Sequence, residues 1–137
     1  MIQATYTTFL AVGLGGAFGA MLRYAISLWA VQRFDALMPT ATYIGRFMGT
    51  LIANAIGALL IGVLFVVITE KGIIAESWRP LLVVGFLGAL TTFSTFSLEA
   101  VGLLQQGEWP TAMVYILASV IICMLLTWAG IELARWY

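Results

Sequence analysis

Four long apolar stretches, separated by short polar segments, fill most of the chain. They are Thr5 to Gln32, Phe47 to Thr69, Leu81 to Leu104 and Trp109 to Ile131. A bilayer core about 30 Å thick needs roughly 20 apolar residues of helix, and each stretch is long enough. The first contains one charged residue, Arg23, the third contains one, Glu99, and the other two contain none. The pattern predicts an all-α membrane protein with four transmembrane helices in a single domain, residues 1–137.

The short connections refine this prediction. Only residues 105–108 separate the third and fourth stretches, which predicts that these two helices are antiparallel neighbours.

The connections and termini place few basic residues on each side of the membrane. The amino terminus, second connection and carboxyl terminus share Lys71, Arg79 and Arg135, whereas the first and third connections hold Arg33 and Arg46. Because this count is nearly a tie, the chain has either one weakly preferred orientation or both orientations, followed by antiparallel pairing.

Composition excludes several classes of function. The chain is 63% hydrophobic and 9% charged, which is more apolar side chain than a soluble core of 137 residues can bury. Six basic and six acidic residues cancel and form no basic run, so nucleic-acid binding is unsupported. There is no histidine and no nucleophile with a nearby base, which argues against an enzyme. The single cysteine, Cys123, reads as a small buried apolar side chain.

Polar residues in the second stretch point to a helix interface. Gly49, Ala53 and Gly57 repeat every four residues, a spacing that lets helix backbones approach closely. Thr50 and Asn54 share a neighbouring face. The Asn54 amide has two hydrogen-bond donors, so it either contacts an anion or bridges two helices. In the first stretch, Arg23 either snorkels to the interface or gives an entry vestibule a positive potential.

The third stretch is unusual, because residues 85–99 combine glycines with five hydroxyl side chains. Such residues weaken a helix and predict a break between Gly88 and Thr92, near the middle of the membrane. Carbonyls freed by a break are hard ligands for a small cation such as Na⁺. The alternative is an unbroken helix whose hydroxyls bond back to its own carbonyls.

The residues after this point follow two helical stripes. Phe93 and Phe96 should point to one side, and Thr92, Thr95 and Glu99 to a neighbouring side. The two phenylalanines either face lipid or core, or offer their positive ring edges to an anion. In the fourth stretch a third stripe, Tyr115, Ser119 and Cys123, recurs every four residues and serves either helix packing or a polar path.

The run from Gly85 to Ser97 closely resembles the third-helix signature of the Fluc (CrcB) family of small fluoride channels. Gly19 to Tyr24 is similar to the end of that family's first helix, and Gly49-Thr50-Leu51 with Asn54 and Gly57 is similar to its second. The resemblance implies a fluoride-selective channel that passively exports F⁻ across the cell's inner (plasma) membrane and protects against fluoride toxicity. It also implies an antiparallel, dual-topology homodimer with a structural Na⁺ at its centre.

Position by position, the resemblance assigns roles to individual residues. Fluoride would pass Phe93, Phe96, Asn54 and the vestibule residue Arg23, with polar tracks formed by Thr50, Thr92, Thr95, Glu99, Tyr115 and Ser119. The backbone carbonyls of Gly88 and Thr91 would hold Na⁺. Ala89 and Cys123 depart from the family pattern, in which a second glycine is common at the first position and a serine is found in some members at the second. A small multidrug exporter is an alternative, but it would need an acid in the first helix, and Thr5 to Gln32 contains none. A purely structural membrane protein is another alternative, but it does not account for the run from Phe93 to Phe96.

Overall fold

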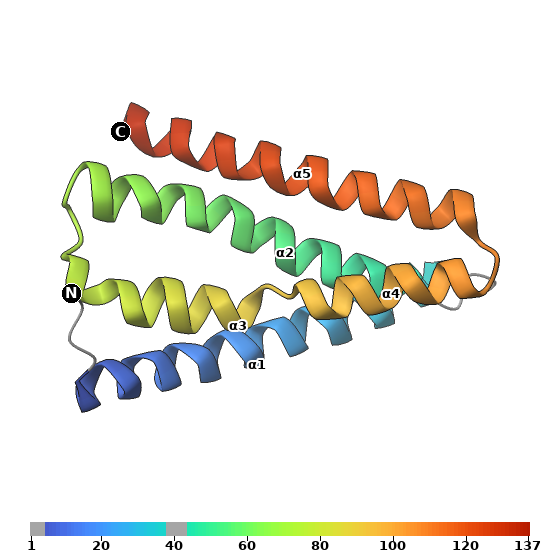
Figure 1. The fold of residues 1–137 in the computed structure, drawn as a ribbon, viewed down its shortest axis with the longest axis horizontal. Helices are drawn as coiled ribbons and strands as arrows, with labels where there is room; N and C mark the ends of the chain where they lie inside the picture. Colours follow the sequence, from blue (N-terminus) through green and yellow to red (C-terminus); the bar gives the residue numbers. More distant parts are fainter. Residues whose placement is uncertain (1–4, 38–43) are drawn as a thin grey trace.

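The computed structural model describes residues 5–37 and 44–137, which form helices joined by short connections (Figure 1). The elements are α1 (Tyr6–Leu37), α2 (Ile44–Phe65), η1 (Val66–Glu70), η2 (Glu76–Trp78), η3 (Pro80–Leu87), α3 (Gly88–Leu90), α4 (Phe93–Gln105) and α5 (Trp109–Trp136). η1 and η3 are π-helical, and η2 is a 3₁₀ turn. η1 continues α2, while η2, η3, α3 and α4 together make the third span.

The prediction of four long apolar helices is confirmed. Four segments are long and apolar enough to cross a membrane: Tyr6–Leu37, Ile44–Glu70, Glu76–Gln105 and Trp109–Trp136. Each is longer than its apolar stretch because the helices continue through polar residues at their ends. α1 therefore includes Arg33 and Asp35, and the Asp35 carboxylate accepts a hydrogen bond from the Gly45 amide at the start of α2, at 3.2 Å. An acid at this end of α1 caps the next helix.

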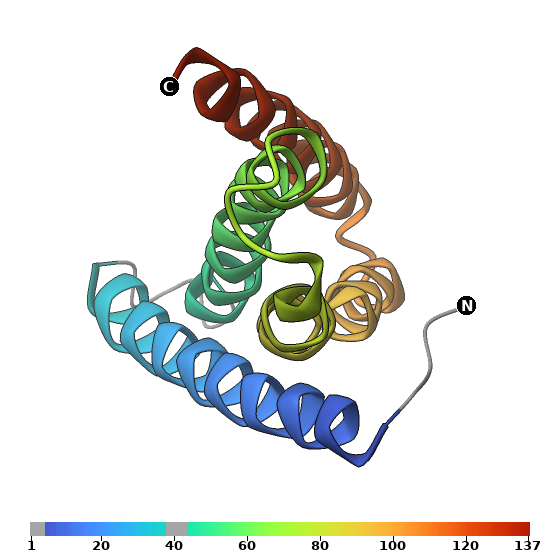
Figure 2. The same cartoon turned by 90° about the vertical axis from the view of Figure 1, so that its left-hand side faces the viewer.

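The helices are arranged around α2 and the third span. α2 packs against both α1 and α5, α1 lies along η3 and α3, and α4 packs against α5 (Figure 2). α4 and α5 are joined by a tight reversal at Gly107, which has a φ of +80°, so the predicted antiparallel pair is present. Seen along the bundle, α1 and α5 lie on opposite sides of the other two spans.

Small residues allow these helices to lie close together. A Cβ on Gly85 of η3 would lie 2.6 Å from the Val12 carbonyl oxygen of α1, so only glycine fits at this crossing. The predicted small stripe of α2 is buried, with Gly49 against Ser27 of α1 and Gly57 against the Thr91 side chain. Close backbone approach of this kind replaces the large buried side chains that hold a water-soluble bundle together.

The third span is interrupted, as the sequence predicts. Thr91 has φ −86° and ψ 153°, and Thr92 has φ −149° and ψ 116°, so both are extended between two helical halves. Gly88–Leu90 stays helical, and the break occupies the last two residues of the predicted segment (Figure 1). The alternative of an unbroken helix is therefore wrong.

Candidate functional site

Asn54 of α2 holds the break in the third span. Its Nδ2 donates a hydrogen bond to the Thr92 carbonyl oxygen at 3.1 Å, and its Oδ1 accepts one from the Thr92 N–H at 2.7 Å. One side-chain amide thus satisfies both backbone groups of an extended residue, as membrane burial requires. Of the two interpretations of Asn54, the helix bridge is present, and among residues 5–37 and 44–137 it uses one of the two amide N–H donors.

The break also frees the carbonyls of Gly88 and Thr91 from their α-helical donors. In a continuous helix the N–H groups of Thr92 and Thr95 would donate to the carbonyls of Gly88 and Thr91. Instead, Thr92 donates to Asn54, and the Thr95 N–H donates to Thr92 Oγ1 at 3.2 Å. Both carbonyls therefore lose their α-helical donors, and two backbone oxygens close in sequence are a donor set that suits a hard cation such as Na⁺.

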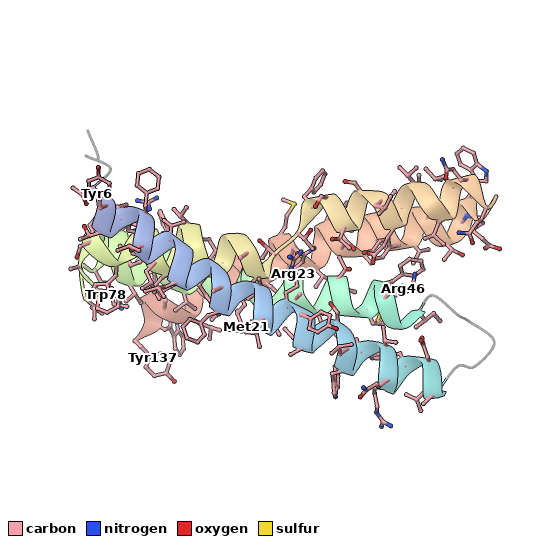
Figure 3. All side chains as sticks on the ribbon, turned by 90° about the horizontal axis from the view of Figure 1, so that it is seen from below. Tyr6, Met21, Arg23, Arg46, Trp78 and Tyr137 are labelled. Atoms are coloured by element: carbon pink, nitrogen blue, oxygen red, sulfur yellow. The ribbon has the colours of Figure 1, made fainter. Side chains whose placement is uncertain are left out.

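Hydroxyl groups cluster where α4 begins. Thr92 caps the helix, and its Oγ1 donates to Thr95 Oγ1 at 3.0 Å and lies 3.2 Å from Ser94 Oγ. Beside this cluster is a small cavity of about 160 Å³ lined by Ala20, Arg23, Tyr24, Ser27, Thr50, Thr92 and Thr95. Arg23 lies near the middle of the molecule's length rather than at a helix end, so it is badly placed to snorkel (Figure 3).

Glu99 links three helices. Its Oε1 accepts a hydrogen bond from the Thr50 hydroxyl at 3.0 Å, and its Oε2 accepts one from the Tyr115 hydroxyl at 2.7 Å. Thr50 and Tyr115 are buried, and Glu99 is half-buried between them. The acid of the third span is thus paired with two hydroxyl donors, so its hydrogen bonds connect α2, α4 and α5.

The two phenylalanines lie on one side of α4, as predicted. Their ring centroids are 5.5 Å apart, and Phe96 lies 5.4 Å from the Tyr115 ring. Phe96 is 9% exposed, whereas Phe93 is 78% exposed. The pair therefore runs from the interior of the chain to its open surface.

A larger cavity of about 480 Å³ lies beside the break and receives residues from every span except α1. Its polar wall consists of Asn54, Thr91, Thr92, Ser119, Cys123 and Thr127, and its apolar wall includes Phe93 and Phe96. Ser119 is 6% exposed, and its Oγ has no hydrogen-bond partner among residues 5–37 and 44–137. Thr92 lines both cavities, so the two are neighbours at the break.

The structure places the predicted site residues in three connected groups. Phe93, Phe96, Asn54, Thr92, Ser119, Gly88 and Thr91 line the large cavity; Arg23, Thr50, Thr92 and Thr95 line the small one; and Glu99 joins Thr50 to Tyr115. Tyr24, Ser27 and Thr127 were missed. Spacing was an available signal for two of them, because Ser27 follows Arg23 by four residues and Thr127 follows Cys123 by four.

Known proteins are similar to this chain along most of its length. A family model described as "CrcB-like protein, Camphor Resistance (CrcB)" matches residues 10–131. Three curated proteins named "Fluoride-specific ion channel FluC" are similar. That of Saccharophagus degradans is 46% identical over 82% of this chain and 78% of its own length. That of Chloroflexus aurantiacus is 42% identical over 93% of this chain and 95% of its own length. That of Hahella chejuensis is 46% identical over 90% of this chain and 91% of its own length.

Proposed function

We infer that this chain, which belongs to the CrcB-like family, is a fluoride-specific ion channel of the plasma membrane and not an enzyme. The observation that carries the inference is that relatives with this name align over about nine-tenths of the chain, across the helix break and both phenylalanines. Fluoride enters cells as neutral HF and ionises at neutral pH. A passive path for F⁻ then lets the membrane potential drive the anion out and protects the cell from fluoride toxicity.

We propose that fluoride moves along the two cavities that share Thr92. Along this path the ion exchanges part of its hydration for weak ligands, which permits fast release. The second amide N–H of Asn54 and the unpartnered hydroxyl of Ser119 are donors on the wall of the large cavity. Phe93 and Phe96 offer ring edges, whose positive partial charge attracts an anion without a full countercharge.

Arg23 and Glu99 have different roles in this proposal. Arg23 lines the small cavity, where its positive charge raises the local concentration of anions. Glu99 accepts hydrogen bonds from Thr50 and Tyr115, so it does not contact fluoride but orients these two hydroxyls. Thr95, on the wall of the small cavity beside Thr92, adds a hydroxyl to the path.

We propose that residues 1–137 form one domain and that two copies pair in antiparallel orientation. Phe93 is 78% exposed on a single chain although it borders the proposed path, so a second copy is a suitable cover. The nearly equal number of basic residues on the two sides supports insertion in both orientations.

A structural Na⁺ fits the carbonyls of Gly88 and Thr91 at the break. The N–H groups that a helix would aim at these oxygens are engaged by Asn54 and by Thr92 Oγ1. Two subunits would supply two such pairs of oxygens at the dimer centre. When bound, the ion would neutralise the partial negative charge of these carbonyls, and Asn54 keeps the backbone in the conformation that presents them.

Purified protein in liposomes is expected to release fluoride rapidly and retain chloride. The reason is that a narrow, weakly liganded path admits the small ion and excludes the larger one. Ion-selective electrodes measure both ions after valinomycin and K⁺ set the driving force. Protein-free liposomes are the control, and equal leakage of the two halides would contradict the function.

Labelling in whole cells tests the antiparallel arrangement. In a Cys123→Ser background, Ala75→Cys and Gln106→Cys place single thiols in the exposed connections at opposite ends of the spans. With both orientations present, a membrane-impermeant thiol reagent is expected to label about half of each variant from outside. Full labelling of one position and none of the other would show a single orientation and reject the antiparallel dimer.

A further inference from the structure

The wall of the large cavity carries a thiol and a hydroxyl one helical turn apart. Cys123, the only cysteine of the chain, lines this cavity, and Ser119 lies four residues earlier on α5. Side chains with this spacing have Cβ atoms about 5–6 Å apart. The Ser119 side chain is more than nine-tenths buried, and its Oγ has no hydrogen-bond partner in the described part of the chain. The fold therefore leaves a buried hydroxyl oxygen available to a ligand held by the thiol.

We propose that Cys123 and Ser119 form a binding site for a soft, thiophilic metal compound and that its occupation blocks the anion path. Thiol sulfur is the preferred ligand of soft metals, and Ser119 Oγ is placed as a weak second ligand. The surrounding wall is mostly apolar, with Ala58, Ile61 and Val120 among its residues, so it favours a neutral compound over a bare cation. Mercuric chloride, which is a neutral molecule in dilute chloride solution, has this chemistry.

The binding step balances without any change of oxidation state. The Cys123 S–H bond breaks and its proton passes to water, while one Hg–Cl bond breaks and releases chloride. A Cys123 Sγ–Hg bond forms, and the second chloride stays on the metal. An excess of a competing thiol reverses the exchange, so the block is reversible.

A metal bound at Cys123 would block fluoride because the thiol and the proposed fluoride contacts line the same cavity, and this step rests on the proposed function. Asn54, Thr92 and Phe96, the proposed fluoride contacts, line the same 480 Å³ space as Cys123. A metal and its chloride at Cys123 occupy part of that space, and a narrow path tolerates little obstruction. The thiol that this block requires is Cys123, the single cysteine of this sequence.

Metal binding is measured first, because it does not depend on conduction. Mass spectrometry of the purified protein after HgCl₂ is expected to find one mercury per wild-type chain and none on Cys123→Ser. Ser119→Ala is expected to bind one but to release it at a roughly threefold lower dithiothreitol concentration, since it lacks one weak polar ligand. Absence of mercury from the wild type, or release from Ser119→Ala at the wild-type concentration, would overturn the two-residue site.

Efflux then tests the block. HgCl₂ is expected to lower wild-type fluoride efflux at least about tenfold, as for an obstructed narrow path, and dithiothreitol should restore it. Fluoride efflux through Cys123→Ser should be unaffected by HgCl₂.

The double variant Cys123→Ser, Met124→Cys is the matched control, because Met124 is 68% exposed on the same helix and lies outside the cavity lining. It should bind mercury and still conduct. A block of this control, or normal conduction by mercury-loaded wild type, would refute the cavity site. Untreated protein that does not conduct would refute the channel function instead, and the binding measurement would still decide the site.

Discussion

Fluoride efflux through Phe96→Ile is expected to fall at least about tenfold, a loss of about 1.4 kcal/mol in the stabilisation of the passing ion. The substitution keeps an apolar side chain of similar bulk but removes the ring edge on the cavity wall. Phe96 is the buried member of the pair. Its ring centroid lies 5.5 Å from that of Phe93 and 5.4 Å from that of Tyr115, and the exposed Phe93 ring does not occupy this buried position. Phe93→Ile should slow efflux in the same direction.

The matched control is Phe47→Ile. Phe47 also packs on the Tyr115 ring, with centroids 5.1 Å apart, but it is not part of the cavity lining. This variant removes an aromatic contact to Tyr115 and should conduct fluoride within about twofold of wild type, because Phe47 lies outside the lining of both cavities. Initial efflux rates at equal protein-to-lipid ratio provide the comparison. An equal loss in Phe96→Ile and Phe47→Ile would assign the effect to Tyr115 packing and remove Phe96 from the path.

The four helices could be predicted from the sequence because a membrane imposes a simple rule. Every backbone group at that depth needs an internal partner, so long apolar stretches are helices. The ends could not be predicted from hydropathy, since α1 continues through Arg33 to Leu37, where the polar headgroup region no longer selects against charge. The break was visible as well, because glycines and hydroxyls in residues 85–97 weaken a helix locally.

What stabilises the break was not visible in the sequence. Asn54 and Thr92 are 38 positions apart, and only the packing of α2 against the third span brings them together. For the same reason Asn54 had two open interpretations, which spacing alone could not separate. The Ser119 hydroxyl has no hydrogen-bond partner in the described part of the chain, and this is likewise a tertiary property, because it depends on how far the side chains of other helices reach towards it.

Asn54→Leu is expected to lower the free energy of unfolding by about 2 kcal/mol or more, since it leaves the N–H and carbonyl of Thr92 unpaired inside a span. It is also expected to remove stabilisation by Na⁺. A bound ion stabilises the folded protein in proportion to the logarithm of its concentration over its dissociation constant. Without the Asn54 bridge, Thr92 is no longer held in its extended conformation, so the carbonyls of Gly88 and Thr91 are no longer fixed in position for the ion.

The measurement is the difference in Tm between Na⁺ and N-methylglucamine buffers of equal ionic strength. Wild type should unfold several degrees higher in Na⁺, an increase of the size that a bound ligand gives. Thr50→Val is the matched control, because Thr50 lies one turn away on the same face of α2 and its hydroxyl bonds to Glu99 rather than to the break. It should lose stability in both buffers but keep the Na⁺ difference, whereas Asn54→Leu should lose that difference. A full Na⁺ effect in Asn54→Leu would mean that the carbonyls are held without Asn54, and a wild type indifferent to Na⁺ would exclude the ion from the break.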